Sequence, residues 1–228
     1  MKHISYLSLI AGLALFGCNS DTKSTKLSKT NSVIKSKTLI KPRSEETKLP
    51  DDSKDKEEIQ ILIRQMLKWA DSKNEFDLIP ALSKDSICVG IDFDKLNQNL
   101  EKLRKTGFFA EEFISNYNRI LKTLDKKIKN KEFEKWNTYE LPTFSFANDV
   151  SPWCSCQDNL SWDNVEVEII NLSADKGELK WNWKVDTNTD QSWKDFAYKF
   201  SVVKVDNKWQ ISYLQGFDYA ESIKRDGL

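Results

Sequence analysis

Two cysteines separated by a single residue, Cys154 and Cys156, stand in the segment "SPWCSCQDN" at residues 151–159. Thiols at such a spacing can close a disulfide, bind a metal or take part in redox exchange. The spacing lacks the two intervening residues of a thioredoxin-like redox motif, and three cysteines without histidine form a poor zinc site. The third thiol of this part of the chain is Cys88. We therefore expect a structural disulfide, with unpaired buried thiols and a metal or redox site as the alternatives.

Two pairings of these cysteines are open. A bond between Cys154 and Cys156 would close a small, strained ring that is reduced more easily than an ordinary bridge. A bond from Cys88 to either of them would close a long loop and stabilise the fold by about 4 kcal/mol. The odd number of thiols excludes pairing all three within one chain. In both cases we expect the cysteines to contribute stability and no chemistry.

The sequence carries its single histidine at position 3. The rest of the chain therefore cannot form a Ser-His-Asp or Cys-His catalytic unit, a histidine zinc site or a histidine proton shuttle. The charges also balance, with 35 basic and 35 acidic residues. Because nucleic-acid binding needs a clustered positive field, we expect no nucleic-acid partner.

Several tryptophans are candidates for ligand or partner contact. Trp153, Trp162 and Trp193 fall in predicted loops, where exposed indoles could stack on a sugar or anchor a protein partner. Core packing is the alternative for these three. Trp181 and Trp183 are two residues apart in a predicted strand, so both should point into the core.

Residues 1–17 form a charged and then apolar segment, "MKHISYLSLIAGLALFG", with the layout of a secretory signal and a length too short to cross a bilayer. The end of this segment and the next residue, "LFGC", resemble the processing site of bacterial lipoproteins, in which the cysteine takes up diacylglycerol. The resemblance implies acylation of Cys18, palmitate included, and attachment to the cell envelope. Asn19, where an inner-membrane lipoprotein would often carry Asp, favours the outer membrane. The alternative is an ordinary signal peptide followed by an incidental cysteine.

The segment after Cys18 predicts a tether. Residues 19–53 contain no glycine, aromatic residue or cysteine and are dense in Lys, Ser and Thr. Such a segment has too little apolar surface to offset the entropy of ordering. Its lysines could also rest on anionic lipid. We expect three parts: a signal at 1–17, a lipidated cysteine and tether at 18–53, and a single α+β domain at 54–228.

The spacing of apolar residues in this domain predicts helices first and strands afterwards. A period near four predicts three helices, and a period of two predicts two antiparallel hairpins. In the second hairpin, Asp206 and Asn207 supply a turn that tolerates positive φ. Helices that cover one face of an antiparallel sheet define an α+β domain. The predicted helices are 54 to about 74, preceded by Ser53 as cap, about 92–107 and about 109–129, and the predicted strands are 165–170, 178–185, 196–205 and 208–215.

Three short motifs carry a family resemblance: "FISNYNRI" at 113–120, "PWCSCQD" at 152–158 and "VVKVDNKWQISYL" at 202–214. They resemble an uncharacterised family of bacterial lipoproteins with the nuclear-transport-factor-2-like fold, a cone in which a curved sheet wraps over helices. Gln157 and Asp158 fit the Gln-Asp pair that precedes the sheet in that family. Relatives with this fold include enzymes, binding domains and toxin-immunity proteins, so fold alone does not settle function.

A catalytic interpretation must use carboxylates and phenols. Tyr117, Asp149 and Asp158 could gather at the mouth of the cone, as an acid and a phenol do in ketosteroid isomerase. No spacing in the sequence requires that arrangement. Asp158 is more simply a turn residue, and Tyr117 more simply a helix residue that packs inward.

These observations predict a non-catalytic binding or interaction domain attached to the membrane through lipid on Cys18, without cofactor or metal. Its partner is a protein or a small ligand, contacted through the candidate residues Tyr117, Trp153, Gln157, Asp158, Trp162 and Trp193. Two alternatives stay open. One is an immunity-type inhibitor of a toxic effector in the periplasm, and the other is a small hydrolase or isomerase that uses the cone as its pocket.

Overall fold

Four antiparallel strands form the main sheet in the order β3-β4-β5-β6. The computed structural model describes residues 52–72, 76–184 and 191–225, and all of these belong to one compact unit. Trp181 of β4 pairs with Val167 of β3 and Tyr198 of β5, so large side chains share one face. The strands are β3 (Val165–Leu172), β4 (Lys176–Trp183), β5 (Tyr198–Val205) and β6 (Lys208–Leu214).

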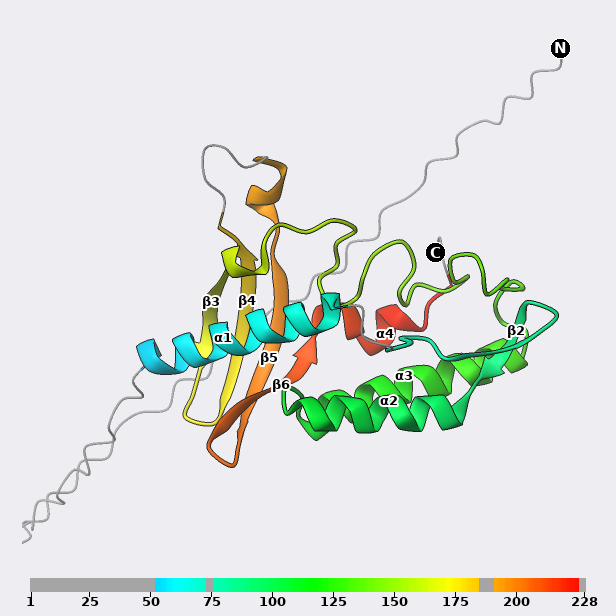
Figure 1. Ribbon diagram of the computed structural model, residues 1–228, viewed down its shortest axis with the longest axis horizontal. Helices are drawn as coiled ribbons and strands as arrows, with labels where there is room; N and C mark the ends of the chain where they lie inside the picture. The colour runs from blue at the N-terminus through cyan, green and yellow to red at the C-terminus, as the bar shows by residue number, and fades with distance from the viewer. Residues whose placement is uncertain (1–51, 73–75, 185–190, 226–228) are drawn as a thin grey trace, which may run out of the picture. The chain divides into compact units, whose positions relative to one another are not determined.

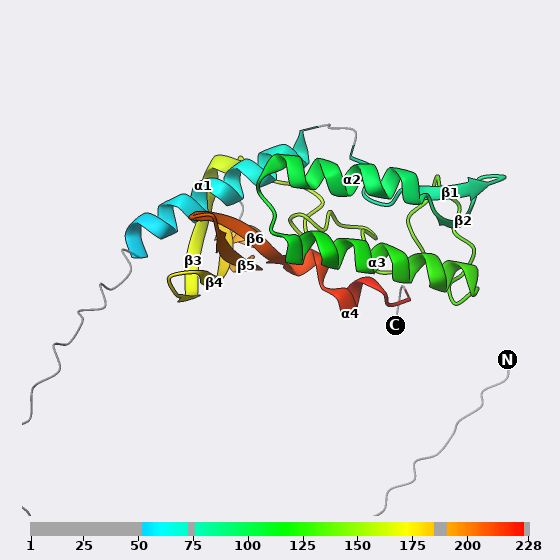
Figure 2. The same ribbon diagram turned by 90° about the horizontal axis from the view of Figure 1, so that it is seen from below.

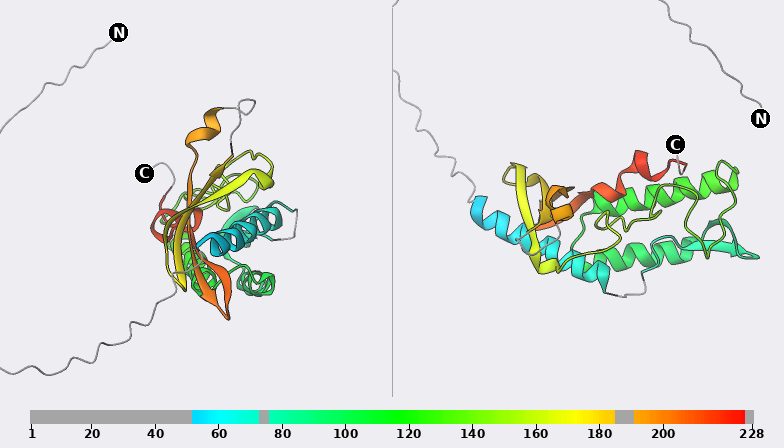
Figure 3. Two further views of the ribbon diagram at one scale, coloured as in Figure 1. Left: turned by 90° about the vertical axis from the view of Figure 1, so that its left-hand side faces the viewer. Right: turned by 90° about the horizontal axis from the view of Figure 1, so that it is seen from above.

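The two faces of the main sheet differ in polarity because the side chains alternate along each strand. Valine, leucine and aromatic side chains on the inner face are buried. The outer face carries ion pairs between neighbouring strands, Lys180 with Glu168 and Lys184 with Glu166. Figure 3 shows α1 (Asp52–Asp71) against one face of this sheet. The predicted packing of helices on an antiparallel sheet is thus confirmed.

Helix α1 crosses the strands of the main sheet (Figure 1), and two of its side chains bond the outer edge of β3. The guanidinium of Arg64 donates to the Val165 carbonyl oxygen from Nε at 2.9 Å and from Nη2 at 2.7 Å. The amide of Val167 donates to Gln60 Oε1 at 3.2 Å. At the opposite edge of the sheet, Ile211 of β6 exchanges backbone hydrogen bonds with Phe108 and Ala110. Side chains of α1 and the segment between α2 and α3 thereby bond backbone N–H and C=O groups at the sheet edges. Unpaired groups of this kind could form hydrogen bonds with a strand of another chain.

Helices α2 (Phe93–Thr106) and α3 (Glu111–Lys129) lie side by side and extend beyond the main sheet (Figures 1 and 2). The carboxylate of Asp92 accepts hydrogen bonds from the first turn of α2, and Gly107 ends that helix with φ of 70°. A left-handed residue at this position favours glycine, so the end of α2 is encoded locally. The apolar stripe of α3 predicted from the sequence is buried from Phe113 to Leu124, and Ile128 in the last turn is partly buried.

A second, two-stranded sheet packs on the far end of α3 (Figure 2). It consists of β1 (Ala81–Lys84) and β2 (Ile87–Ile91). The buried carboxylate of Asp125 in α3 accepts a hydrogen bond of 2.9 Å from the Ile91 amide and fixes β2 on the helix. The segment that follows α3 continues this sheet, because the amides of Cys88 and Thr138 donate to the carbonyls of Trp136 and Ser86.

The sequence did not predict this small hairpin, and several predicted boundaries move, including the end of β3 from 170 to 172 and the bounds of β4 from 178–185 to 176–183. Helix α1 begins at Asp52, two residues before the predicted start, and ends at Asp71, short of residue 74. Strand β5 begins at Tyr198, not at 196. The turn at Asp206 and Asn207 is confirmed, with φ of 48° and 61°. The chain ends in two short elements packed on α3 and β5, η3 (Gln215–Phe217) and α4 (Tyr219–Ser222).

Candidate functional site

Cys154 and Cys156 form a disulfide, and Cys88 is a buried free thiol. Of the two pairings that the sequence left open, the structure contains the small ring. Ser155, between the bonded cysteines, has φ of 52°, a left-handed conformation that a residue other than glycine adopts at a free-energy cost of about 1–2 kcal/mol. Both bonded cysteines are buried, with 4% and 8% of their surfaces exposed.

The disulfide loop, residues 147–159, is fixed to the end of the main sheet by a buried phenol. The hydroxyl of Tyr198 donates to the Pro152 carbonyl oxygen at 2.6 Å and accepts from the Gly216 amide at 2.9 Å. Burial raises the pKa of Tyr198, so the phenol stays neutral. A Cβ at Gly216 would overlap the Pro152 carbonyl. Position 216 therefore requires glycine for this close approach.

A polar contact closes the base of the same loop. The amide of Gln157 donates to Asp149 Oδ1 at 2.8 Å. Ala147 and Asp149 have φ of 55° and 67°, so the backbone here turns through two left-handed residues. Asp158, the other half of the predicted Gln-Asp pair, is exposed. The structure thus gives Gln157 a role in holding the loop.

Of the two interpretations that the sequence left open, core packing describes Trp153 and Trp162, of which only 8% and 9% is exposed. Trp153 packs in a group of aromatic rings, with its centroid 4.6 Å from Phe217 and 5.5 Å from Trp69. The indole N–H of Trp162 donates to Asp71 Oδ2 at 3.0 Å. Burial of an indole removes a large apolar area from water and outweighs the loop context.

Trp193 is partly buried in η2 (Gln191–Asp195). Its ring centroid lies 5.7 Å from that of Trp183. The prediction that Trp181 and Trp183 belong to the core is confirmed. Trp193 therefore extends a core aromatic cluster.

A small pocket beside the disulfide brings several predicted residues together. It has a volume of about 110 Å³, enough for a few water molecules and well below the usual size of a ligand site. Ordered water is a better occupant for it than an organic ligand. Its walls include Asp71, Trp153, Cys154, Cys156, Gln157 and Trp162.

The structure does not bring Tyr117 together with Asp149 and Asp158, the two carboxylates considered for catalysis with it. Tyr117 is fully buried, and its hydroxyl donates to the Leu78 carbonyl at 3.0 Å and accepts from Asn99 at 3.4 Å. Burial raises the pKa of Tyr117. Asp149 and Asp158 are exposed in the disulfide loop. The phenol thus positions the segment that enters β1.

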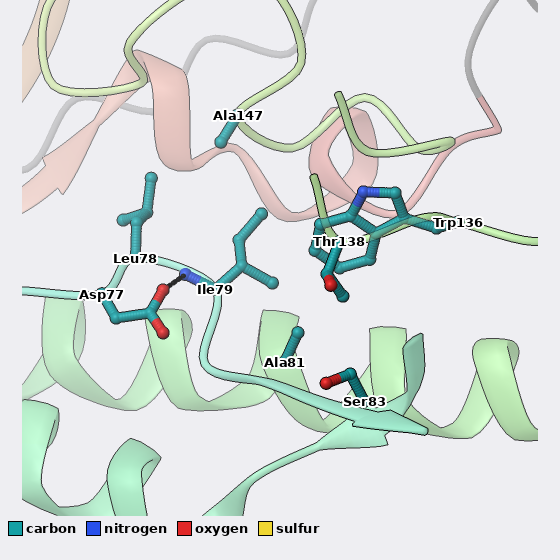
Figure 4. A pocket seen from close by; sticks show the side chains of 8 residues that line it. All are labelled: Asp77, Leu78, Ile79, Ala81, Ser83, Trp136, Thr138 and Ala147. Carbon is teal, nitrogen blue, oxygen red and sulfur yellow. Dashed lines mark hydrogen bonds between the residues drawn. The ribbon is translucent and has the colours of Figure 1, made fainter. Parts of the chain in front are cut away.

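That segment forms one wall of a larger pocket, which we call the hairpin pocket (Figure 4). Its volume is about 360 Å³. The Asp77 carboxylate accepts from the Ile79 amide at 3.2 Å and shapes the entry to β1, and Trp136 closes the opposite side. Its lining comprises Asp77, Leu78, Ile79, Ala81, Ser83, Trp136, Thr138 and Ala147.

A second pocket, the Cys88 pocket, also uses Trp136 as a wall and has a volume of about 480 Å³. The thiol of Cys88 donates to the Gly90 carbonyl at 3.3 Å, and burial raises its pKa, as does the nearby Asp125 carboxylate. Trp136 itself is 8% exposed, and its indole N–H donates to the Glu140 carbonyl. The lining comprises Cys88, Val89, Ile128, Lys129, Lys131, Phe133, Glu134, Lys135, Trp136 and Thr143.

Sequence reasoning missed both pockets because their walls come from β1, β2 and the irregular segment 133–147. The short apolar run "ICVGI" at 87–91 was a usable signal for β2. Nothing local marks Trp136 as the wall shared by two pockets. That role depends on contacts between segments distant in sequence.

Within the described parts of the chain, no group of three or more His, Cys, Asp or Glu side chains is placed to hold a metal ion. None of the helices described by the structure is long and apolar enough to cross a membrane. Cys18 and the predicted signal and tether up to residue 51 lie outside the described residues. Comparisons with family models, with curated proteins and with solved structures found no match.

Proposed function

We propose that the chain is a cell-envelope lipoprotein of the outer membrane whose α+β domain binds a partner or ligand without catalysing a reaction. Lipid on Cys18 anchors it, and the segment up to residue 51 tethers the domain. The fold we propose is a variant of the nuclear-transport-factor-2-like cone. Register shifts in β3 and β5 support it, because such bulges curve a sheet.

The observation that carries the binding function is the pair of pockets on either side of Trp136. Their volumes of about 360 and 480 Å³ fall within the ~300–1,000 Å³ typical of ligand sites. Both are built on the β1–β2 hairpin and the segment after α3. We therefore assign ligand binding to this end of the domain, and not to the disulfide loop.

A second candidate function, immunity-type inhibition of an effector, has one observation in its favour. Tyr139 is 85% exposed and Leu141 is 59% exposed, in the loop beside β2. Large apolar side chains held out in solvent are suited to a protein interface. Formation of a tight complex with a co-encoded effector would select this function.

Capture of partners from solubilised envelopes tests whether the domain binds a protein through Tyr139 and Leu141. The bait is the chain carrying Cys18→Ser, and a second bait adds Tyr139→Ser and Leu141→Ser. Protein binding at this end predicts a partner that the first bait retains and the second loses. Ile170→Ser with Val205→Ser is the matched control, because these side chains are 54% and 40% exposed on the main sheet. Equal capture by both variants would contradict the assignment of the protein interface.

A further inference from the structure

The Cys88 pocket combines an apolar interior with a charged rim. Its inner walls are Cys88, Phe133 and Trp136, each less than a tenth exposed, together with the partly buried Ile128; Val89, also in the lining, is 40% exposed. A neutral buried thiol behaves as a small apolar group, so Cys88 adds to this interior. The only described carboxylate in the lining is that of Glu134.

The charges around this pocket do not cancel. Lys129 pairs with Asp125 at 2.9 Å, Lys127 with Glu132 at 3.1 Å, and Arg225 with Glu134. Lys131 and Lys135 also line the pocket, and among the described residues neither has a carboxylate partner. Two uncompensated positive charges therefore stand at the edge of an apolar cavity.

We infer that the Cys88 pocket binds a soluble amphipathic anion, such as a medium-chain carboxylate. The apolar chain occupies the space between Phe133, Trp136 and Cys88, and the acid group lies at Lys131 and Lys135. This inference deepens the binding function proposed above and names its ligand class. Apolar burial supplies affinity, and the two lysines favour an anionic head group over a neutral or cationic one.

Calorimetric titration with octanoate, octanol and octylamine tests this assignment, using the full chain with Cys18→Ser and the Cys154–Cys156 bond intact. We expect one octanoate per chain. Two exposed ion pairs contribute about tenfold in affinity, so octanol should bind about tenfold more weakly and octylamine more weakly still. Equal affinity for octanoate and octanol, or no octanoate binding, would overturn the inference.

Two double variants locate the head group. Lys131→Ala with Lys135→Ala should lower octanoate affinity about tenfold and leave octanol affinity unchanged. Lys199→Ala with Lys208→Ala removes the same net charge from exposed positions on the main sheet and should change neither. Loss of octanoate affinity in the control pair alone, or in both pairs equally, would place the anion elsewhere.

Alkylation of Cys88 locates the apolar chain. With Cys18 replaced and the other two cysteines bonded, iodoacetamide reports on Cys88 alone, and saturating octanoate should slow its reaction severalfold. An alkylation rate that saturating octanoate does not change would show that the ligand binds outside this pocket. Binding to phosphatidylglycerol vesicles without binding of soluble octanoate would also contradict the inference. If octanoate fails but Tyr139→Ser with Leu141→Ser still abolishes partner capture, the ligand class is wrong and the proposed binding function stands.

Discussion

At the scale of single residues, Gly216 shows how one close contact fixes the disulfide loop. A methyl group at this position would overlap the Pro152 carbonyl, which also accepts the Tyr198 hydroxyl. Gly216→Ala should therefore lower the free energy of unfolding by about 2–3 kcal/mol, as overpacking does. Gly107→Ala is the control, because position 107 has φ of 70° and open space around it, so only the conformational cost of about 1 kcal/mol applies. Urea unfolding compares the two, and equal losses would contradict the close contact.

Asp55 supplies a pH-dependent contact between α1 and the sheet. Its Oδ1 accepts from Lys204 Nζ and from Trp209 Nε1, each at 2.9 Å. Partial burial acts to raise the pKa of Asp55, but these hydrogen bonds outweigh it and hold the pKa below 3.8. The group therefore stabilises the fold fully above pH 3.8 and loses this contribution as pH falls through the folded pKa.

Asp55→Asn should accordingly lower the free energy of unfolding by about 2 kcal/mol at neutral pH, the contribution of hydrogen bonds to a charged group. The difference from the unmodified chain should shrink in urea titrations taken stepwise below pH 3.8. Asp195→Asn, at an exposed side chain of η2, should change stability by less than about 0.5 kcal/mol. A difference that grows toward acid pH would mean that the folded-state pKa of Asp55 is raised and not lowered.

At the scale of elements, α1 protects the edge of β3 through Arg64. Arg64→Ala leaves the Val165 carbonyl without its side-chain donor and should lower stability by about 1.5–3 kcal/mol. Because the edge is then open, we also expect concentration-dependent association by light scattering. Lys68→Ala removes only an exposed ion pair with Asp163, so it should change stability by at most about 1 kcal/mol. An Arg64→Ala variant that stays monomeric at high concentration would argue against edge protection.

The elements that sequence reasoning recovered are those with a clear period. Helix α3 and the hairpin at Asp206 and Asn207 follow directly from apolar spacing and turn chemistry. The β1–β2 hairpin was missed because its strands have four and five residues and depend on Asp125 of α3 for their position. Sequence alone left Trp153 and Trp162 open between partner contact and core packing, because no local pattern records the tertiary contacts that bury them.

The Cys154–Cys156 disulfide joins two residues of a single turn, so it constrains little of the chain. Loop-closure arithmetic gives it about 1.5 kcal/mol, against about 4 kcal/mol for a bridge from Cys88. Reduction should therefore lower the thermal midpoint by only a few degrees, and added zinc should leave it unchanged. A fall of ten degrees or more on reduction, measured by calorimetry, would indicate the longer bridge.

At the scale of the whole molecule, the described residues between 52 and 225 belong to one compact unit. A chain that starts at Thr47 should keep the thermal midpoint of the full chain, because the composition of residues 19–46 predicts little packing. A chain that starts at Ile59 loses Asp55 and should melt several degrees lower. A lower midpoint for the chain that starts at Thr47 would show that the preceding segment contributes to the fold.

The short span of the disulfide also determines how far the oxidised domain can be stretched. The bond joins residues separated by two positions. When the chain is pulled, the bond therefore keeps only about 7 Å of contour length from extending. A bridge from Cys88 to the same loop would withhold roughly 230 Å. An oxidised domain pulled from its two ends would therefore release nearly its whole length, and an optical-trap recording should show extension that is almost independent of redox state.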